Sequence, residues 1–195
     1  MLNILLKKEQ MTDEELIRHT LQNQVYFGQV IERYQQKLLR YIMKISNLRM
    51  EEAEDTLQDI FIKVYQNLNG FDSSLRFSSW IYRITHNEVI SRYRKYQRRP
   101  EGHTWDVEEY VWNNLASSLD TKALVEAESL QKSIQSVLEQ MDGKYREVLI
   151  LKFLEEKDYG EISDILQKPL GTVGTLISRA KKQFQKEAKK LAIEL

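Results

Sequence analysis

The sequence lacks cysteine altogether and holds only two prolines and seven glycines among its 195 residues. Without cysteine the chain can form no disulfide, no thiolate metal site and no thiol nucleophile, which suits a reducing cytoplasm. The scarcity of proline and glycine, beside abundant leucine, glutamate, glutamine and lysine, favours an all-α protein. No stretch alternates apolar and polar residues for long enough to indicate a sheet.

Long apolar runs are also missing. The N-terminal stretch MLNILLKKEQ has an apolar core too short for a signal peptide, and it offers no small-residue cleavage site. No later run approaches the roughly 20 apolar residues that span a bilayer. We therefore expect a cytoplasmic protein.

The chain has 29 Lys and Arg residues and 29 Asp and Glu residues, so its charge is balanced overall. Along the sequence, however, the charges are unevenly distributed. Residues 76–99 and residues 168–190 each hold seven cations and one acid, so each block carries a net charge of +6. Residues 100–130 hold one cation and seven acids, a net charge of −6. Two basic blocks within helical patterns indicate two contacts with a polyanion such as a nucleic acid. A patchy solvated surface is the alternative.

Helical periodicity organises the first half of the chain. Thr12 and Glu15 have the spacing of a capping box that starts a helix. Apolar residues then follow a helical stripe over 27–45 and again over about 51–68, after which Asn69-Gly70 is expected to form a left-handed stop. A fourth helix begins at Phe77 and ends in the basic cluster RYRKYQRRP.

Residues 100–127 lose this periodicity and gain acid, which predicts a linker. It contains Trp105, Tyr110 and Trp112, which are unusual for a spacer and suit docking on another surface. We therefore expect two four-helix domains, residues 1–99 and residues 128–195, joined by an acidic linker.

The last two predicted helices have the pattern of a helix-turn-helix. Asp158 and Glu161 mark the start of the first, Gln167-Lys168-Pro169 turns the chain, and Pro169 suits the first position of the second. The second helix is expected to bury Leu170, Val173, Ile177 and Ala180. It continues into basic residues, which favours the motif whose second helix lies in the DNA major groove. An ordinary helical hairpin is the alternative.

Three segments together resemble the extracytoplasmic-function (ECF) family of bacterial RNA polymerase sigma factors. AEDTLQDIFIKVYQNLNGFD (53–72) is similar to the family's polymerase-binding helix, and RFSSWIYRITHNEVISRYR (76–94) to the segment that opens and reads the promoter −10 element. KYREVLILKFLEEKDYGEISDILQKPLGTVGTLISRAKK (144–182) is similar to the domain that reads the −35 element. The resemblance covers about residues 12–98 and 128–190.

The resemblance implies three interfaces and two further contacts. The clamp helices of the polymerase β′ subunit would be held by Asp55, Gln58, Asp59 and Ile62. The −10 element would be contacted by Arg76, Arg83, Asn87, Arg92, Arg94, Lys95, Arg98 and Arg99. The −35 element would be contacted by Thr172, Thr175, Ser178, Arg179 and Lys182. The polymerase β flap and an anti-sigma factor are the further implied partners, and the loop at 71–77 would receive a base turned out of the DNA strand.

Three residues need separate comment. Trp80 lies in the apolar stripe of its helix, so a core role is favoured over base stacking. Gly174 and Leu176 stand where the family usually has cations, which leaves the −35 sequence open. Gly174 also costs about 1 kcal/mol of helix propensity relative to Ala, which a close approach of the backbone to DNA or to another helix would explain.

Three other functions remain alternatives. A stand-alone dimeric helix-turn-helix regulator would leave residues 55–59 without a role. A metal-dependent nuclease is disfavoured because His19, His86 and His103 have no ligand spacing and no nucleophile or phosphate-loop motif appears. A membrane-surface helix is disfavoured because the apolar face of the last helix is needed for the helix-turn-helix core. We thus expect a non-enzymatic DNA-binding subunit without cofactor or metal.

Overall fold

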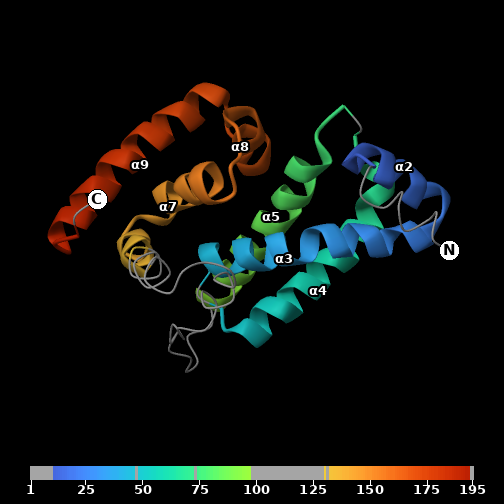
Figure 1. Ribbon diagram of the computed structural model, residues 1–195, viewed down its shortest axis with the longest axis horizontal. Helices are drawn as coiled ribbons and strands as arrows, with labels where there is room; N and C mark the ends of the chain where they lie inside the picture. Colours follow the sequence, from blue (N-terminus) through green and yellow to red (C-terminus); the bar gives the residue numbers. More distant parts are fainter. Residues whose placement is uncertain (1–10, 47, 73, 98–129, 131, 194–195) are drawn as a thin grey trace, which may run out of the picture. The chain divides into compact units, whose positions relative to one another are not determined.

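The computed structural model describes residues 11–46, 48–72, 74–97, 130 and 132–193 (Figure 1). The predicted linker with its three aromatic residues lies outside these ranges, as do Arg98, Arg99 and Pro100. The backbone divides into an N-terminal and a C-terminal unit, and each is described by itself. All regular elements of the described residues are helical, so the prediction of an all-α protein is confirmed.

Three long helices form the body of the N-terminal unit: α3 (Phe27–Ile45), α4 (Met50–Asn67) and α5 (Phe77–Gln97). They pack against one another, and α2 (Asp13–Gln22) closes one end together with the short 3-10 helix η1 (Gln24–Tyr26) (Figure 1). Most members of the apolar stripes predicted for α3, α4 and α5 are buried, and the others, such as Ile84 and Ile90, are half-buried. The largest fully buried side chains of this unit are Leu16, Leu38, Tyr41, Ile42, Ile60, Phe77 and Ile81.

The predicted capping box starts α2. The backbone N–H of Glu15 donates to Thr12 Oγ1 at 3.2 Å, and that of Thr12 donates to Glu15 Oε2 at 2.9 Å. Asp13 then ties the helix to α3, because it accepts hydrogen bonds from Arg33 at 2.6 Å and from the Tyr34 hydroxyl. Burial, reinforced by the charge of Asp13, raises the pKa of Tyr34 far above its usual value, so the phenol remains a donor.

Trp80 belongs to the core, as its place in the apolar stripe predicts. Its side chain is 7% exposed, and its ring centroid lies 5.3 Å from that of Phe71 and 5.7 Å from that of Phe77. Aromatic side chains packed in this way contribute large buried areas. The loop that leads into α5 is therefore fastened to the core by Phe71, which is half-buried.

The end of α4 differs from the prediction. Neither Asn69 nor Gly70 takes a left-handed backbone conformation. The helix ends at Asn67 and tightens into a 3-10 turn, η2 (Leu68–Gly70), whose Leu68 is buried. Tight last turns of this kind satisfy the free carbonyls at a helix end without a left-handed residue, so the expected stop is wrong.

The C-terminal unit contains a helix at 132–139, α7 (Gly143–Leu149), a π-helical turn η4 (Ile150–Leu154), α8 (Tyr159–Leu166) and α9 (Leu170–Lys190). Helices α7 and α9 pack against each other (Figure 1). The π turn is closed by the N–H of Glu155, which donates to the carbonyl of Ile150 at 2.9 Å. No helix within the described ranges is long and apolar enough to cross a membrane.

Candidate functional site

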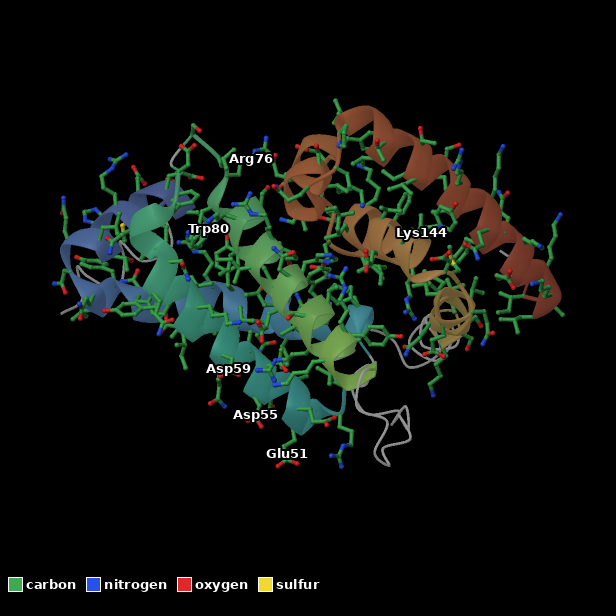
Figure 2. All side chains as sticks on the ribbon, turned by 180° about the vertical axis from the view of Figure 1, so that it is seen from behind. Glu51, Asp55, Asp59, Arg76, Trp80 and Lys144 are labelled. Atoms are coloured by element: carbon green, nitrogen blue, oxygen red, sulfur yellow. The ribbon has the colours of Figure 1, made fainter. Side chains whose placement is uncertain are left out.

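The outward face of α4 is polar and acidic. Asp55, Gln58, Asp59 and Ile62 are all exposed, whereas the opposite side of the helix is buried. Figure 2 shows Asp55 and Asp59 in a row with Glu51 along this helix. Spacings of three and four residues place side chains on one helix face, so the four predicted residues form a single surface. This surface can pair with cations and amides of another helix.

Sequence reasoning missed an aromatic extension of this face. Tyr65 follows Ile62 by three residues and is 39% exposed, while Ile62 is 53% exposed. The Tyr65 ring packs edge-on against Phe27 of α3, with 5.0 Å between centroids. The sequence did contain a signal for this extension, because Tyr65 lies outside the apolar stripe of α4.

The basic residues predicted to contact the −10 element do not share one face of α5. Arg76, Arg83, Asn87 and Arg94 are spaced by seven, four and seven residues, which places them along one side of the helix. Asn87 and Arg94 are exposed, and Arg83 is half-buried. Figure 2 shows Arg76 near the start of the helix. The described part of the predicted surface is therefore a stripe that runs along most of α5.

Two predicted residues, Arg92 and Lys95, lie off this stripe. Arg92 falls on the side of α5 that packs against α4, where its Nε donates to Glu88 at 2.8 Å and its Nη2 donates to Asp59. Lys63 of α4 donates to the same Glu88. The structure thus brings together two residues, Asp59 and Arg92, that the sequence assigned to different partners.

These four residues, Asp59 and Lys63 of α4 with Glu88 and Arg92 of α5, are called the α4–α5 ladder below. Glu88 is its least exposed member, with 12% of its side chain accessible. Burial raises the pKa of Glu88, but hydrogen bonds from Lys63 and Arg92 outweigh burial and hold that pKa below its usual value. Burial likewise opposes the charge of Arg92, but Glu88 and Asp59 raise its pKa. Glu88 and Arg92, the central pair of the ladder, are therefore both charged at neutral pH.

The loop at 71–77 is ordered by its own polar groups where it is described. Asp72 Oδ1 accepts a hydrogen bond from the backbone N–H of Ser74 at 2.9 Å, and its carbonyl accepts from Leu75 at 3.0 Å. The bond from Ser74 lowers the pKa of Asp72. Trp80 is buried, but among the described side chains of α5 Tyr93 is 49% exposed, and this exposed aromatic residue was not predicted.

In the C-terminal unit the two last helices form the predicted helix-turn-helix. Asp158 caps α8 through a hydrogen bond of 2.8 Å from the N–H of Glu161. Gln167 takes the left-handed conformation, with φ of 52°, and turns the chain. The N–H of Lys168 then donates to the carbonyl of Ser163 at 3.1 Å, while Ser163 Oγ donates to the carbonyl of Lys168 at 2.5 Å.

Two details of α9 correct the prediction. Pro169 precedes the helix, because its ψ of 143° is extended and the first helical residue is Leu170. Leu170 is 56% exposed and does not belong to the inward face, which Val173, Ile177 and Ala180 form.

The predicted groove-facing residues of α9 are all exposed. Thr172, Thr175, Arg179 and Lys182 are spaced by three, four and three residues, so they share one side, with Ser178 at its edge. The Thr175 hydroxyl donates to the carbonyl of Gly171 at 2.9 Å, which leaves its lone pairs free to accept. Arg179 and Lys182 form no ion pair with any residue in the described ranges, so both cations are available to phosphate.

Gly174 does not mark a close approach to another helix. A Cβ added there would lie 3.8 Å from Tyr159 Cε2 of α8, an ordinary van der Waals distance. Leu176, at the second position where a cation was expected, is half-buried. Neither residue presents a polar group to the exposed side of α9.

No group of acidic and histidine side chains in the described part of the chain is arranged to hold a metal ion. The site is accordingly a set of surfaces: an acidic face on α4, a basic stripe on α5, and a polar and basic side of α9 at the end of a helix-turn-helix.

Comparison with known families agrees with this arrangement. The family model for Sigma-70 region 2 matches residues 30–99, and the model for Sigma-70, region 4 matches residues 131–184. These two regions, in this order, define the class of the protein as a sigma-70-type sigma factor.

Individual relatives narrow the class. The ECF RNA polymerase sigma factor SigW of Bacillus subtilis (strain 168) is 32% identical over 172 residues, which cover 85% of this chain and 90% of that protein. The ECF RNA polymerase sigma-E factor of Escherichia coli (strain K12) is 27% identical over 190 residues, which cover 94% of this chain and 97% of that protein. The chain belongs to the family of ECF RNA polymerase sigma factors.

A solved structure shares the fold. The sigma factor RpoE from Bartonella quintana, solved in complex with the anti-sigma factor NepR, matches with a TM-score of 0.66 and 22% identity. The match covers 84% of this chain and 96% of that chain.

Proposed function

We propose that the protein is an alternative sigma factor that binds core RNA polymerase and directs transcription initiation at specific promoters. The observation that carries this proposal is the presence of both sigma-70 regions, in order, in a chain that is similar to SigW over most of its length. In this role the protein lends specificity to the polymerase, and none of its residues performs bond chemistry.

The N-terminal domain, residues 1–99, docks on the polymerase through α4. Asp55, Gln58 and Asp59 are exposed on one face with the apolar side chain of Ile62 beside them. Carboxylates and an amide at this spacing are complementary to a basic and amide-bearing helix pair such as the β′ clamp helices. The C-terminal domain, residues 128–195, contacts the β flap, and residues 100–127 link the two domains.

Promoter DNA is contacted at two places. The basic stripe of α5 engages the melted −10 element, where cations neutralise the phosphates of a single strand. The exposed side of α9 enters the major groove at the −35 element, with Arg179 and Lys182 on base edges or phosphate. Two weak contacts on one tethered body raise the effective concentration at correctly spaced sites, which gives the complex its promoter preference.

We further infer an anti-sigma factor as a regulatory partner in the cytoplasm. Support comes from the polar and apolar faces that this chain exposes, and from the fold it shares with RpoE of Bartonella quintana, which was solved with the anti-sigma factor NepR. Such a partner would compete with the polymerase for the exposed face of α4.

The test is reconstitution with bacterial core polymerase on a library of genomic promoter fragments, with sequencing of transcript starts. We expect new starts that share two sequence elements and that depend on this protein. The double variant Asp55→Lys/Asp59→Lys should lower affinity for core polymerase at least about tenfold, because it places like charges against the clamp helices. Glu32→Lys, at an exposed acid of α3, is the control for charge reversal away from this surface. Unchanged affinity of the double variant would refute docking through α4, and tight palindrome-specific binding by the protein alone would indicate a stand-alone regulator.

A further inference from the structure

The α4–α5 ladder places a basic residue of α5 within the acidic face of α4. Arg92 is about half a helical turn away from the stripe formed by Arg83, Asn87 and Arg94, so it points away from the side proposed for DNA. Its side chain is 31% exposed and already engages two carboxylates. A guanidinium held in this way is poorly placed to bind a phosphate on the other side of its helix.

We propose that Arg92 is a positioning residue for the polymerase-binding carboxylate of Asp59, and that Glu88 holds it in place; this inference rests on the proposed docking through α4. Two different nitrogens make the two contacts. Nε donates to Glu88 Oε1 at 2.8 Å, and Nη2 donates to Asp59 Oδ2. The guanidinium is planar and rigid, so fixing Nε at Glu88 also fixes where Nη2 meets Asp59.

Glu88 is a suitable anchor for this purpose. Its side chain is only 12% exposed, it lies four residues before Arg92 on the same helix, and it also accepts a hydrogen bond from Lys63 across to α4. The anchor is therefore held by both helices, and the position of Arg92 does not depend on the exposed Asp59 alone.

Asp59 remains able to bind a partner while Arg92 holds it. Its side chain is 53% exposed, and the contact with Arg92 uses Oδ2, so Oδ1 is left to accept hydrogen bonds. An exposed aspartate would otherwise lose rotamer freedom on binding. When Arg92 already holds the Asp59 side chain, this loss of rotamer freedom on binding is avoided. For one side chain the saving corresponds to about two- to tenfold in affinity for the polymerase.

The substitution Arg92→Lys separates this role from a contact with phosphate. Lysine keeps the positive charge, so it would preserve a phosphate contact, but one ammonium group cannot reproduce the two-nitrogen bridge. We expect Arg92→Lys in the full-length chain to weaken binding to core polymerase about two- to tenfold. The same substitution should have no effect in an Asp59→Asn background, since the carboxylate that it positions is gone. Arg18→Lys, an exposed arginine of α2, is the matched control for the exchange.

Binding to a fluorescently labelled single-stranded oligonucleotide of mixed sequence supplies the second readout. Each phosphate contact adds about 0.7 to the slope of log affinity against log salt concentration for a single strand. We expect Arg92→Gln to leave this slope unchanged, whereas Arg94→Gln should reduce it by about 0.7. Neither slope depends on the polymerase, so this measurement is informative even if a variant is less stable.

The outcomes are distinct. A reduced salt slope for Arg92→Gln, together with unchanged polymerase affinity for Arg92→Lys, would overturn the proposal and make Arg92 a DNA contact. Tighter polymerase binding by Arg92→Lys would also overturn it, because Arg92 would then mask Asp59. If Asp55→Lys/Asp59→Lys left polymerase affinity unchanged, the proposed docking face itself would be wrong, independently of Arg92.

Discussion

Gly174 permits a sharp test of how α9 is built. The residue lies inside a 21-residue helix, where glycine is about 1 kcal/mol less favourable than alanine. The structure shows no reason for that cost within the described residues, since an added Cβ would lie 3.8 Å from Tyr159 Cε2 and nothing nearer is present. We therefore expect Gly174→Ala to stabilise the C-terminal unit by about 1 kcal/mol.

The assay must report on the C-terminal unit alone. None of the three tryptophans lies within residues 128–195, so tryptophan fluorescence is not a specific probe of this unit. Native-state hydrogen exchange of the α9 amides reports on the C-terminal unit. A stabilisation of about 1 kcal/mol corresponds to about fivefold slower exchange of these amides. For a domain of this size, the same stabilisation corresponds to a rise of about 4–8 °C in the melting temperature of the C-terminal unit.

Gly171→Ala is the matched control. No atom lies within 4 Å of a Cβ added at Gly171, but this residue occupies the first turn of α9, where helix propensity counts for less. We expect a smaller stabilisation there. Faster exchange in Gly174→Ala, with Gly171→Ala neutral or stabilising, would show that the packing against Tyr159 does not tolerate a methyl group and would refute the reasoning.

The same variant tests the alternative explanation for Gly174. If its backbone approached DNA closely, Gly174→Ala would weaken binding to the −35 element even though it stabilised the fold. Gly174 is half-buried beside Tyr159 and lies off the exposed side that carries Thr175 and Arg179. We accordingly expect promoter affinity of the holoenzyme to remain unchanged, measured by filter binding on a promoter found by reconstitution.

Two further predictions concern the N-terminal unit. Glu88→Gln should destabilise it by about 1–2 kcal/mol near neutral pH, because charged hydrogen bonds from Lys63 and Arg92 are weakened. Since the pKa of Glu88 is lowered in the folded state, the stabilisation is present above the unfolded-state pKa of about 4.3 and is lost as pH falls through the folded-state value. The difference between wild type and variant in urea unfolding should therefore shrink below about pH 4, and a difference independent of pH would contradict the role of the ionised carboxylate. Trp80→Ala should cost about 3–5 kcal/mol and Trp80→Phe clearly less, because the side chain is buried between Phe71 and Phe77. Weaker DNA binding by Trp80→Ala without loss of stability would instead indicate base stacking.

Local signals in the sequence predicted local structure well. The capping boxes at Thr12 and Asp158 depend on residues three positions apart, and both are present in the structure. The apolar stripes of α3 and α4 repeat over enough turns to fix which side is buried, so the exposure of Asp55 and Ile62 followed from periodicity.

Features that depend on a second element could not be predicted in the same way. Leu170 has the spacing of a core residue, but it is the first residue of α9 and remains largely exposed. Asn69-Gly70 has the composition of a left-handed stop, but the burial of Leu68 favours a 3-10 turn. In both cases tertiary packing, which the local pattern does not contain, decided the outcome.

Arg92 is the most consequential example, because its charge and the resemblance to sigma factors made it a candidate for DNA binding. Glu88 and Arg92 are four residues apart, a spacing that suits a pair within one helix, but the contact with Asp59 requires knowing which side of α5 meets α4. Once that is known, the two sides of α5 can be given different proposed roles. One side is fastened to α4 through Glu88 and Arg92, and the other carries Arg83, Asn87 and Arg94.

This division implies that the two proposed interfaces of the N-terminal unit belong to one rigid pair of helices. The ladder joins α4 to α5 by ionic contacts at Lys63–Glu88 and Arg92–Asp59, above a shared apolar core. A polymerase that orients α4 must therefore orient the basic stripe of α5 as well, without any conformational change in between. Positioning of this kind would lower the entropic cost of engaging the −10 element, because the helix that carries the proposed DNA-binding side chains is already oriented on the polymerase.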